Sequence, residues 1–308
     1  MPAVARVDPK TVFGPEEWAR FTTRSSWRGL LNVAGAWALI FAAGALFVLW
    51  PNPLSYIVAV MLIGARQLGL AILMHDAAHG ALHPNQKIND WVGEWLCAAP
   101  VGARLADYRP YHLKHHRYTE QPEDPDLALS APFPITRASL MRKIIRDLTG
   151  QTFVKQRFGP LFAKKQMSPE GSKVVHRAVN SFLIVNALLL AACALTGYWW
   201  AYPTLWIVPM ATWFPLVTRL RNIAEHACVD TREDPFTHAR TTLANPLERL
   251  LIAPYHVHYH AEHHVFMHVP CYHLPALHRA LIVKGYGPRM QIAPGYFAVL
   301  HEATSATS

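Results

Sequence analysis

Two long uncharged stretches dominate the pattern of hydrophobic and polar positions along the chain. No Lys, Arg, Asp or Glu occurs between Leu30 and Ala65 or between Asn180 and Thr218. A helix rises about 1.5 Å per residue, and roughly 20 apolar residues cross the core of a bilayer. Each stretch is therefore long enough for two membrane-spanning helices.

A turn interrupts each stretch near its middle. Pro51-Asn52-Pro53 divides the first, and the segment from Gly197 to Pro203 divides the second with Trp and Tyr residues that suit a membrane–water interface. The pattern predicts two helical hairpins whose turns lie on the same side of the membrane. The four predicted spans lie near residues 30–50, 54–74, 181–201 and 203–219.

Basic residues predict the orientation of these hairpins. Of 29 Lys and Arg residues, Arg66 lies inside a predicted span, Arg219 is the last residue of another, and neither hairpin turn holds any. The positive-inside rule therefore places both termini and the central segment in the cytosol. We expect an all-α, multi-pass integral membrane protein of a bacterial inner membrane or an endoplasmic reticulum. It would comprise a cytosolic arm (1–29), a membrane domain (30–280) with a cytosolic helical cap (75–179 and 220–280), and a C-terminal tail (281–308).

Net charge and cysteine spacing restrict the partners. The formal charge of +9 suits cytosolic loops attracted to the anionic headgroups of the bilayer, and it also suits a face that docks an acidic electron-transfer protein. No basic motif interleaved with aromatic residues predicts a nucleic-acid partner. The four cysteines form no C-x-x-C pair, which argues against disulfides, zinc ribbons and iron–sulfur ligation.

Three groups of histidines carry the candidate chemistry. They are His75-Asp-Ala-Ala-His79, His112-Leu-Lys-His115-His116 and His260-Ala-Glu-His263-His264. Residues three and four apart share one face of a helix, so each group can direct two imidazoles to a common point. An adjacent His-His pair lets one helix serve two metal ions. All three groups fall on the cytosolic side of the predicted spans and should gather at one membrane surface.

A fourth polar element, Asn222-Ile-Ala-Glu-His226, lies at the cytosolic end of the last predicted span. Alone, such a pair often only snorkels toward water. Beside three histidine groups, we interpret it as part of a metal site. Nine imidazoles without a thiolate do not fit structural zinc, which closes at four ligands that usually include cysteine. Imidazole also suits iron and copper, so ligand type alone leaves the metal open.

In these features the sequence resembles the membrane fatty acid desaturases, within the fatty acid desaturase–hydroxylase superfamily. That family has three histidine boxes, an N-x-x-x-H element after the fourth span, and four spans in two hairpins. Here the neighbourhoods also match, in His112-Leu-Lys-His-His-Arg-Tyr-Thr119, in His260-Ala-Glu-His-His-Val-Phe266, and in the run from Val269 to His278. The resemblance covers roughly residues 30–280. The first box has the shorter three-residue spacing found in part of the family.

The resemblance implies a two-iron centre that uses O2 as co-substrate. Asn222 would act through a water molecule. The ligands that bind the two irons directly would be His75, His79, His112, His115, His116, His226, His260, His263 and His264. We expect no catalytic residue beyond this metal site. The His-Pro-Gly-Gly run of a fused cytochrome b5 module is absent. Electrons would therefore come from a separate ferredoxin or cytochrome b5 type of donor with its reductase.

Neighbouring polar residues receive less specific interpretations. We interpret His83 as a residue of a solvated helix face and Asp124-Pro125-Asp126 as a turn. Arg66 is interpreted as pairing with an acidic residue of the cap, since a charge inside a membrane is costly. Orientation of an imidazole and plain solvent exposure remain equally open for Asp76, Glu225 and Glu262. The histidines around the third box are interpreted as surface or supporting residues: His256, His258, His268, His273 and His278.

Desaturation of a lipid acyl chain is the first functional hypothesis. A hydroxylase or carotenoid ketolase of the same superfamily is the main alternative, because ketolases share the His-Asp-Ala-x-His-Gly box and an Asp-Pro-Asp after the second box. Asn222–His226 and the long excursion at 127–178 favour the desaturase. A metal transporter would need further ionisable residues within its spans. A zinc hydrolase would need an H-E-x-x-H or H-x-x-E-H run, which the sequence lacks.

Overall fold

The computed structural model describes residues 3–162, 169–230 and 234–306. Small parts of the predicted arm, cap and tail therefore lie outside the described residues. The helices are α1 (Pro15–Thr22), α2 (Arg28–Leu49), α3 (Pro53–Ala78), α4 (Gln86–Val92), α5 (Leu105–Tyr118), α6 (Leu127–Ser130), α7 (Arg137–Leu148), α8 (Gln151–Phe162), α9 (Pro169–Leu195), α10 (Val208–Ala211), α11 (Trp213–His226), α12 (Pro246–Leu251), α13 (His260–Val265), α14 (Leu274–Val283) and α15 (Tyr296–Ala303).

Among the described residues the regular structure is helical apart from one small parallel sheet. Strands β1 (Arg240–Thr242) and β2 (Gln291–Ala293) pair with Thr241 opposite Ile292. The sheet joins the segment after α11 to the C-terminal part of the chain. From there α15 returns to α11, and Tyr296 and Val299 pack into the same core cluster as Val217. Residues beyond 280 therefore buttress the helix that carries His226.

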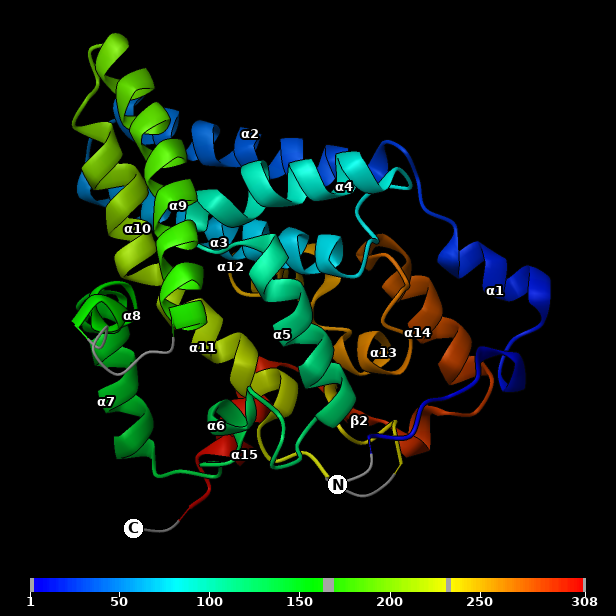
Figure 1. Ribbon diagram of the computed structural model, residues 1–308. Coiled ribbons are helices and arrows are strands. Elements are labelled where there is room, and N and C mark those ends of the chain that lie inside the picture. The colour runs from blue at the N-terminus through cyan, green and yellow to red at the C-terminus, as the bar shows by residue number, and fades with distance from the viewer. Residues whose placement is uncertain (1–2, 163–168, 231–233, 307–308) are drawn as a thin grey trace.

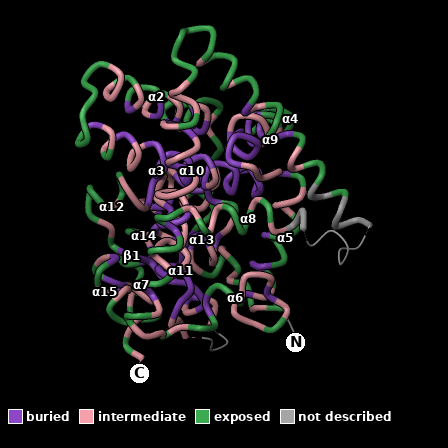
Figure 2. Tube along the Cα trace, turned by 90° about the vertical axis from the view of Figure 1, so that its left-hand side faces the viewer, coloured by how far each residue is buried: buried purple, intermediate pink, exposed green. Residues whose placement is uncertain are grey.

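In the part of the chain that the structure describes, three helices are long and apolar enough to cross a membrane: α2, α3 and the 176–195 part of α9. They suggest an integral membrane protein. Figure 1 shows α2 beside α3, with α9 rising beside α10 and α11. In Figure 2 buried residues concentrate along α3, whereas α2 and α9 carry many exposed residues. Exposed Phe41, Leu183 and Leu188 are among the large apolar side chains on these two helices, and such surfaces suit contact with lipid.

A fourth continuous span at 203–219 is not confirmed. The chain there forms a wide helical turn at Tyr202–Ile207, the short α10, and α11. Pro203, Pro209 and Pro215 recur along this segment. Proline lacks the backbone N–H of the helical ladder and its ring clashes with the preceding turn, so the helix breaks into pieces. The third apolar helix also differs from the prediction, ending at Leu195 rather than near 201.

The two hairpin turns lie side by side, at the upper left of Figure 1. The hydroxyl of Tyr56 donates to the carbonyl of Thr204 over 3.3 Å. Phe47 and Trp200 meet edge to face with ring centroids 6.1 Å apart. The first turn ends at a capping box, in which the Asn52 side chain accepts from the Ser55 N–H and Pro53 occupies the first helical turn.

Close packing against α3 positions the helix that ends at His226. A Cβ added to Gly64 of α3 would lie 2.7 Å from the Cβ of Trp213, at the start of α11. Only glycine permits this approach of the two helices. Gln67, one turn further along α3, donates to the carbonyl of Trp206 over 2.9 Å. The two hairpins are therefore fixed to one another through α3.

The arrangement of the turns predicts the result of labelling. Pro51 and Pro203 are exposed at the two turns. Pro51→Cys and Pro203→Cys, each with the native cysteines replaced by serine, should react with a membrane-impermeant maleimide added to the outside of intact cells. Arg142→Cys on α7 is the control and should react only after the membrane is opened. Reaction of both turn variants only after permeabilisation would reverse the predicted orientation.

Candidate metal centre

Four helices supply the nine predicted histidine ligands. The last two turns of α3 carry His75 and end beside His79, whereas α11 ends at His226. Helices α5 and α13 carry three of the remaining histidines each, and on each helix their spacing places them on neighbouring faces. These six are His112, His115, His116, His260, His263 and His264. All of them are buried or nearly so. In each of the adjacent pairs, His115-His116 and His263-His264, one imidazole points into the first of two groups and the other into the second.

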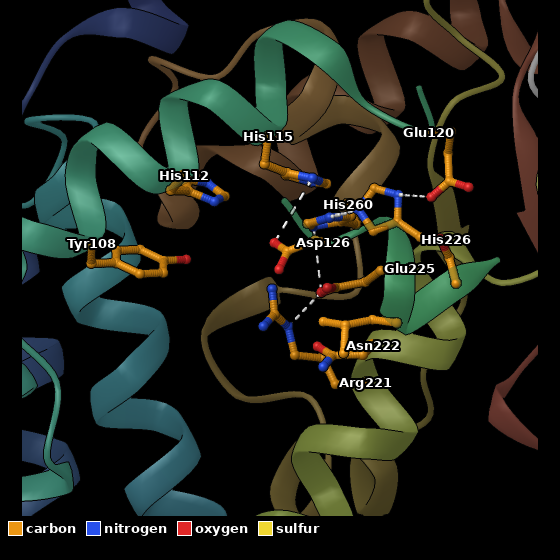
Figure 3. Close-up of a pocket in the computed structure, with 12 residues that line it drawn as sticks. Tyr108, His112, His115, Glu120, Asp126, Arg221, Asn222, Glu225, His226 and His260 are labelled. Carbon is orange, nitrogen blue, oxygen red and sulfur yellow. Dashed lines mark hydrogen bonds and ion pairs between the residues drawn. The ribbon is translucent and has the colours of Figure 1, made fainter. Parts of the chain in front are cut away.

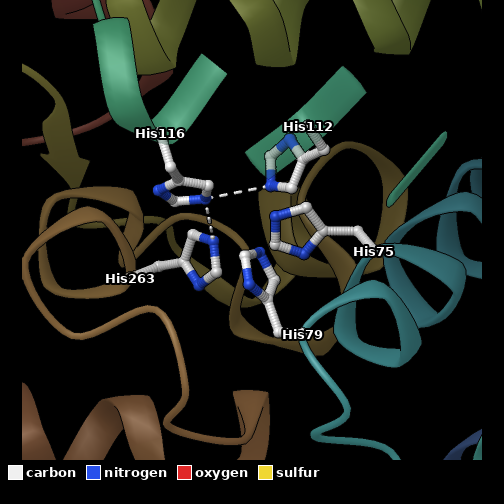
Figure 4. A group of neighbouring side chains, drawn as sticks. All are labelled: His75, His79, His112, His116 and His263. Carbon is white, nitrogen blue, oxygen red and sulfur yellow. Dashed lines mark hydrogen bonds between the residues drawn. The ribbon is translucent and has the colours of Figure 1, made fainter. Parts of the chain in front are cut away.

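The first group contains five imidazoles whose candidate ligand atoms all lie within 4.8 Å of one another. Its members are His75, His79, His112, His116 and His263. The Nε2 atom of His116 lies 3.0 Å from Nε2 of His112 and 3.0 Å from Nε2 of His263. Figure 4 shows the rings converging from three separate segments of the chain.

The second group contains four imidazoles: His115, His226, His260 and His264. Here Nε2 of His226 lies 2.9 Å from Nε2 of His260, and Nε2 of His115 lies 3.3 Å from Nε2 of His264. The two groups are adjacent, because the rings of His116 and His264 have centroids only 4.3 Å apart. The structure thus brings together all nine histidines predicted as ligands and divides them into sets of five and four.

The nitrogen positions fit bound metal ions. Bonds from a first-row metal to imidazole nitrogen are about 2.0–2.1 Å long, so ligands at right angles lie about 3 Å apart, as observed here. Within the described part of the chain, Nε2 of His75 and both ring nitrogens of His79 are buried without a hydrogen-bond partner. An unpaired buried polar atom costs about 1–3 kcal/mol, and a metal ion between the rings would remove that cost.

Hydrogen bonds at the far ring nitrogens orient the second group. The Nδ1–H of His115 donates to Asp124 over 2.9 Å, and that of His226 donates to the carbonyl of His238 over 3.1 Å. Nδ1 of His260 lies 3.4 Å from a carboxylate oxygen of Glu225. Each contact leaves the Nε2 lone pair directed into the group, which is the usual arrangement of metal-binding histidines.

Burial also keeps these imidazoles in the form that binds metals. It lowers the pKa of His226, His260 and His264 well below the ordinary value, and neighbouring imidazoles lower it further. The rings are therefore neutral near pH 7, with a free lone pair. In the described part of the chain none of the four cysteines belongs to either group, so the donor set is nitrogen alone.

A small cavity opens beside the second group (Figure 3). Its volume is about 50 Å³, and Asn222 lines it together with His226 and His260. Asn222 is partly buried and lies one turn before His226 on α11. The Asn222 amide thus lies beside the imidazoles but is not part of the second group. This position suits the predicted action of Asn222 on a metal ion through a water molecule.

Carboxyl groups around this cavity were not predicted as site residues. Glu120 lies 3.8 Å from Nδ1 of His226, and burial raises its pKa to about 7. Burial likewise raises the pKa of Glu225 to about 7, against the effect of Arg221, whose guanidinium donates to it over 2.6 Å. No sequence pattern around Glu120 indicates its contact with His226, because the contact forms only when the loop after α5 reaches the end of α11.

Asp124 has a larger role than the turn that was predicted. It lies in a turn, where its carboxylate accepts the backbone N–H groups of Glu120 and Asp126. The same carboxylate holds the ring of His115. An acidic residue a few positions after the second histidine box is the only local signal that would have indicated this role.

Two interpretations of the sequence were wrong. His83 is buried rather than solvated, and its Nδ1 accepts the N–H of Asn85 over 2.9 Å. Arg66 pairs with no acidic residue among those that the structure describes. Its guanidinium donates to the carbonyl of Leu250 over 2.5 Å and lies 5.7 Å from the centre of the Tyr255 ring. A backbone carbonyl and an aromatic face therefore hold this cation, which a sequence cannot show.

The remaining polar neighbours divide by their contacts. Glu225 approaches His260, whereas Glu262 binds the ring of His278 over 2.5 Å and Asp76 accepts the N–H of Cys271 over 3.1 Å. Of these three acids, only Glu225 approaches a ring of the two groups. Six further histidines belong to neither of the two groups found among the described residues: His83, His256, His258, His268, His273 and His278.

Comparison with known proteins identifies the family. The model of the family described as "Fatty acid desaturase" matches residues 51–292, which is most of the chain. The chain belongs to the fatty acid desaturase family. As a member of that family it is a desaturase-family oxidoreductase, and its histidine groups are consistent with the two-iron site typical of the fatty acid desaturases.

Two curated relatives illustrate the range of the family. A dihydrorhizobitoxine desaturase of Bradyrhizobium elkanii is 29% identical over 283 residues, covering 88% of this chain and 77% of the relative. A beta-carotene ketolase of Paracoccus sp. (strain PC1) is 25% identical over 248 residues, covering 74% and 84%. The relatives thus include both a desaturase and a ketolase.

The orientation of His115 can be tested at Asp124. Asp124→Asn removes the charge that faces the imidazole N–H, and such losses typically lower metal affinity or activity about 10–100-fold. Iron content after growth at limiting iron should therefore fall. Asp126→Asn is the matched control, because Asp126 lies 3.8 Å from the same nitrogen and already accepts the hydroxyl of Tyr111. Equal iron content in both variants and the unaltered protein would contradict the role of Asp124.

Proposed function

We propose that this protein is an O2-dependent desaturase that inserts a cis double bond into the acyl chain of a membrane lipid. The observation that carries the proposal is the pair of adjacent, thiol-free histidine groups, one of five imidazoles and one of four. Each group would hold one iron ion, with Asn222 acting on the second through a water. Membership of the desaturase family and the three long apolar helices support the same proposal.

The reaction balances with an external reductant. Two hydrogens leave neighbouring carbons of the chain as the double bond forms. One O2 takes up these hydrogens together with two further electrons and two protons, giving two molecules of water. Bound iron would supply the reductive activation of O2, for which amino-acid side chains alone have no equivalent. A ferredoxin or cytochrome b5 type of carrier, with a reductase, would supply the electrons one at a time.

The residues around the second group define where the substrate would lie. The cavity beside Asn222 shares that residue and Leu129 with a neighbouring cavity of about 120 Å³. The second cavity lies between α6, α8 and the α10–α11 segment, and Phe153 and Phe214 are among its apolar lining residues. Polar residues, among them Arg157 and Arg219, line the rest of this cavity. An acyl chain lying along Phe153 and Phe214 would approach His226 and His260.

Polar groups at the inner cavity have separate tasks. Arg221 holds Glu225 by an ion pair of 2.6 Å, and Glu225 in turn faces Nδ1 of His260. Glu120 faces His226 from the other side. These contacts keep the second group of imidazoles in place while the substrate occupies the cavity. The predicted cytosolic cap would thereby hold the oxidising centre at the edge of the bilayer.

A ketolase or hydroxylase is the second candidate. The similarity to a beta-carotene ketolase and the shared Asp124-Pro125-Asp126 run favour it. Return of oxygen to the carbon, rather than removal of a second hydrogen, would distinguish its product. We prefer the desaturase because of Asn222 and His226, which lie next to the cavity.

Product analysis tests the reaction. Expression in a host that lacks its own desaturases should yield acyl chains lighter by two hydrogens, seen by mass spectrometry of total lipids. The purified protein should make this product only when a carrier and a reductase accompany NADPH. Products that gain one oxygen would favour the hydroxylase, and products that gain one oxygen and lose two hydrogens would favour the ketolase. Turnover with NADPH alone would contradict the need for a separate donor.

A pair of variants tests the second metal position. His226→Ala removes an imidazole of the second group, so iron content should fall from about two per chain and turnover should cease. Asn222→Ala should retain more iron, because losses beyond the direct ligands cost only about 10–100-fold in affinity or activity. The two variants should differ in metal content more than in activity. Full iron and near-normal product in His226→Ala would show that this element is only structural.

A further inference from the structure

A patch of basic side chains covers one side of the histidine groups. We call it the donor face, and it comprises Arg6, Arg24, Arg117 and His268, all exposed. The N-terminal segment ties it together, since the N–H of Val4 donates to the carbonyl of Arg117 over 2.9 Å. Arg24 and Arg6 both lie within electrostatic range of the His268 ring. Arg6 and Arg24 of the N-terminal arm thus bring their charges to His268, which follows the third histidine box.

The donor face lies directly above the metal centre. Residues 4–7 cover a cavity of about 40 Å³ whose floor includes His116 and His264, one ring from each histidine group. Exposed His268 also contacts the first group, with its ring centroid 6.4 Å from that of His79. At this face a docked molecule would be separated from the histidines by one layer of side chains. Short separation is what electron transfer through a protein requires.

The opposite approach to the histidines has a different charge. The cavity beside Asn222 is lined by the carboxyl groups of Glu120, Asp126 and Glu225, and its one arginine, Arg221, is paired with Glu225. Among the described lining residues it therefore offers no surplus of positive charge to an acidic partner. The substrate approach and the donor face are distinct in position and in electrostatics.

The position of the donor face disfavours the bilayer as its occupant. In Figure 1 the dark blue start of the chain lies at the lower right, whereas the hairpin turns lie at the upper left. Anionic headgroups attract basic residues only within about a Debye length, roughly 8–10 Å at physiological salt. Arg24 precedes α2 by only four residues and therefore lies near the cytosolic headgroups. Residues 4–7, in contrast, lie against Arg117 in the last turn of α5, in the cap, where a soluble partner can reach them.

We propose that a small acidic one-electron carrier protein docks on the donor face, over His268 and residues 4–7. Each docking would deliver one electron, so two dockings would supply the two electrons of one turnover. Complementary charge steers such encounters and speeds association, and the effect weakens as salt rises. The proposal rests on the proposed function for its purpose, although docking itself can be measured without turnover.

Direct binding provides the test. The protein would be placed in nanodiscs of phosphatidylcholine, and a plant-type [2Fe–2S] ferredoxin would serve as the acidic carrier, at low and at high ionic strength. Arg6→Glu combined with Arg24→Glu should weaken ferredoxin binding about tenfold at low salt and raise the KM for ferredoxin, with little change in kcat at saturation.

Two matched variants separate charge at this face from total charge and from folding. Arg137→Glu combined with Arg142→Glu makes the same change of charge at exposed positions of α7 and should bind ferredoxin like the unaltered protein. Arg6→Lys combined with Arg24→Lys keeps the charge and should also bind normally.

Equal ferredoxin binding by the unaltered protein and by the double glutamate variant at the donor face would overturn the docking proposal. So would an effect that appears only when the nanodiscs contain phosphatidylglycerol, because headgroups would then occupy the face. Loss of binding in the donor-face variant, with no oxidised product from any variant, would leave docking intact and contradict the proposed function instead.

Discussion

The structure depends on bringing nine imidazoles to two neighbouring points inside a low-dielectric cap. Each ring must be buried, neutral and aimed, and no protein group pairs the buried ring nitrogens of His79 within the described residues. Unpaired buried donors and acceptors cost free energy that packing must offset. The same arrangement becomes favourable when metal ions take the lone pairs. Folding and metal binding are therefore linked at this site.

Several features serve that requirement. The close approach at Gly64 fixes α11 against α3, and α15 supports α11 from the other side. Asp124, the carbonyl of His238, and Glu225 then fix the rings of the second group. The first group is buried more deeply around the end of α3. The second group, whose rings are held by these contacts at the far ring nitrogens, is thus the one beside the cavity, where a substrate would disturb it most.

Charge is divided between the two approaches to the centre. Carboxyl groups surround the small cavity beside Asn222, whereas arginines and His268 cover the side of residues 4–7. A net charge of +9 conceals this division, because it averages over the whole chain. The proposed reaction, with a hydrophobic substrate and a polar electron donor, would use two such separate approaches. Membership of the family accounts for the metal chemistry but not for this local arrangement of charge.

The sequence by itself determined the parts of the protein that depend on local periodicity. Uncharged stretches predicted the long apolar helices α2, α3 and α9, although not the break in the last predicted span. The i, i+3 and i, i+4 spacing predicted which histidines share a helix face. Only the tertiary structure decided the division into five and four, the role of Asp124, and the partners of Arg66. These depend on contacts between residues far apart in sequence, such as His116 with His263 and Arg66 with Leu250. The broken segment at 202–226 lies between the two cases: its prolines are visible in the sequence, but packing against α3 decided where the pieces lie.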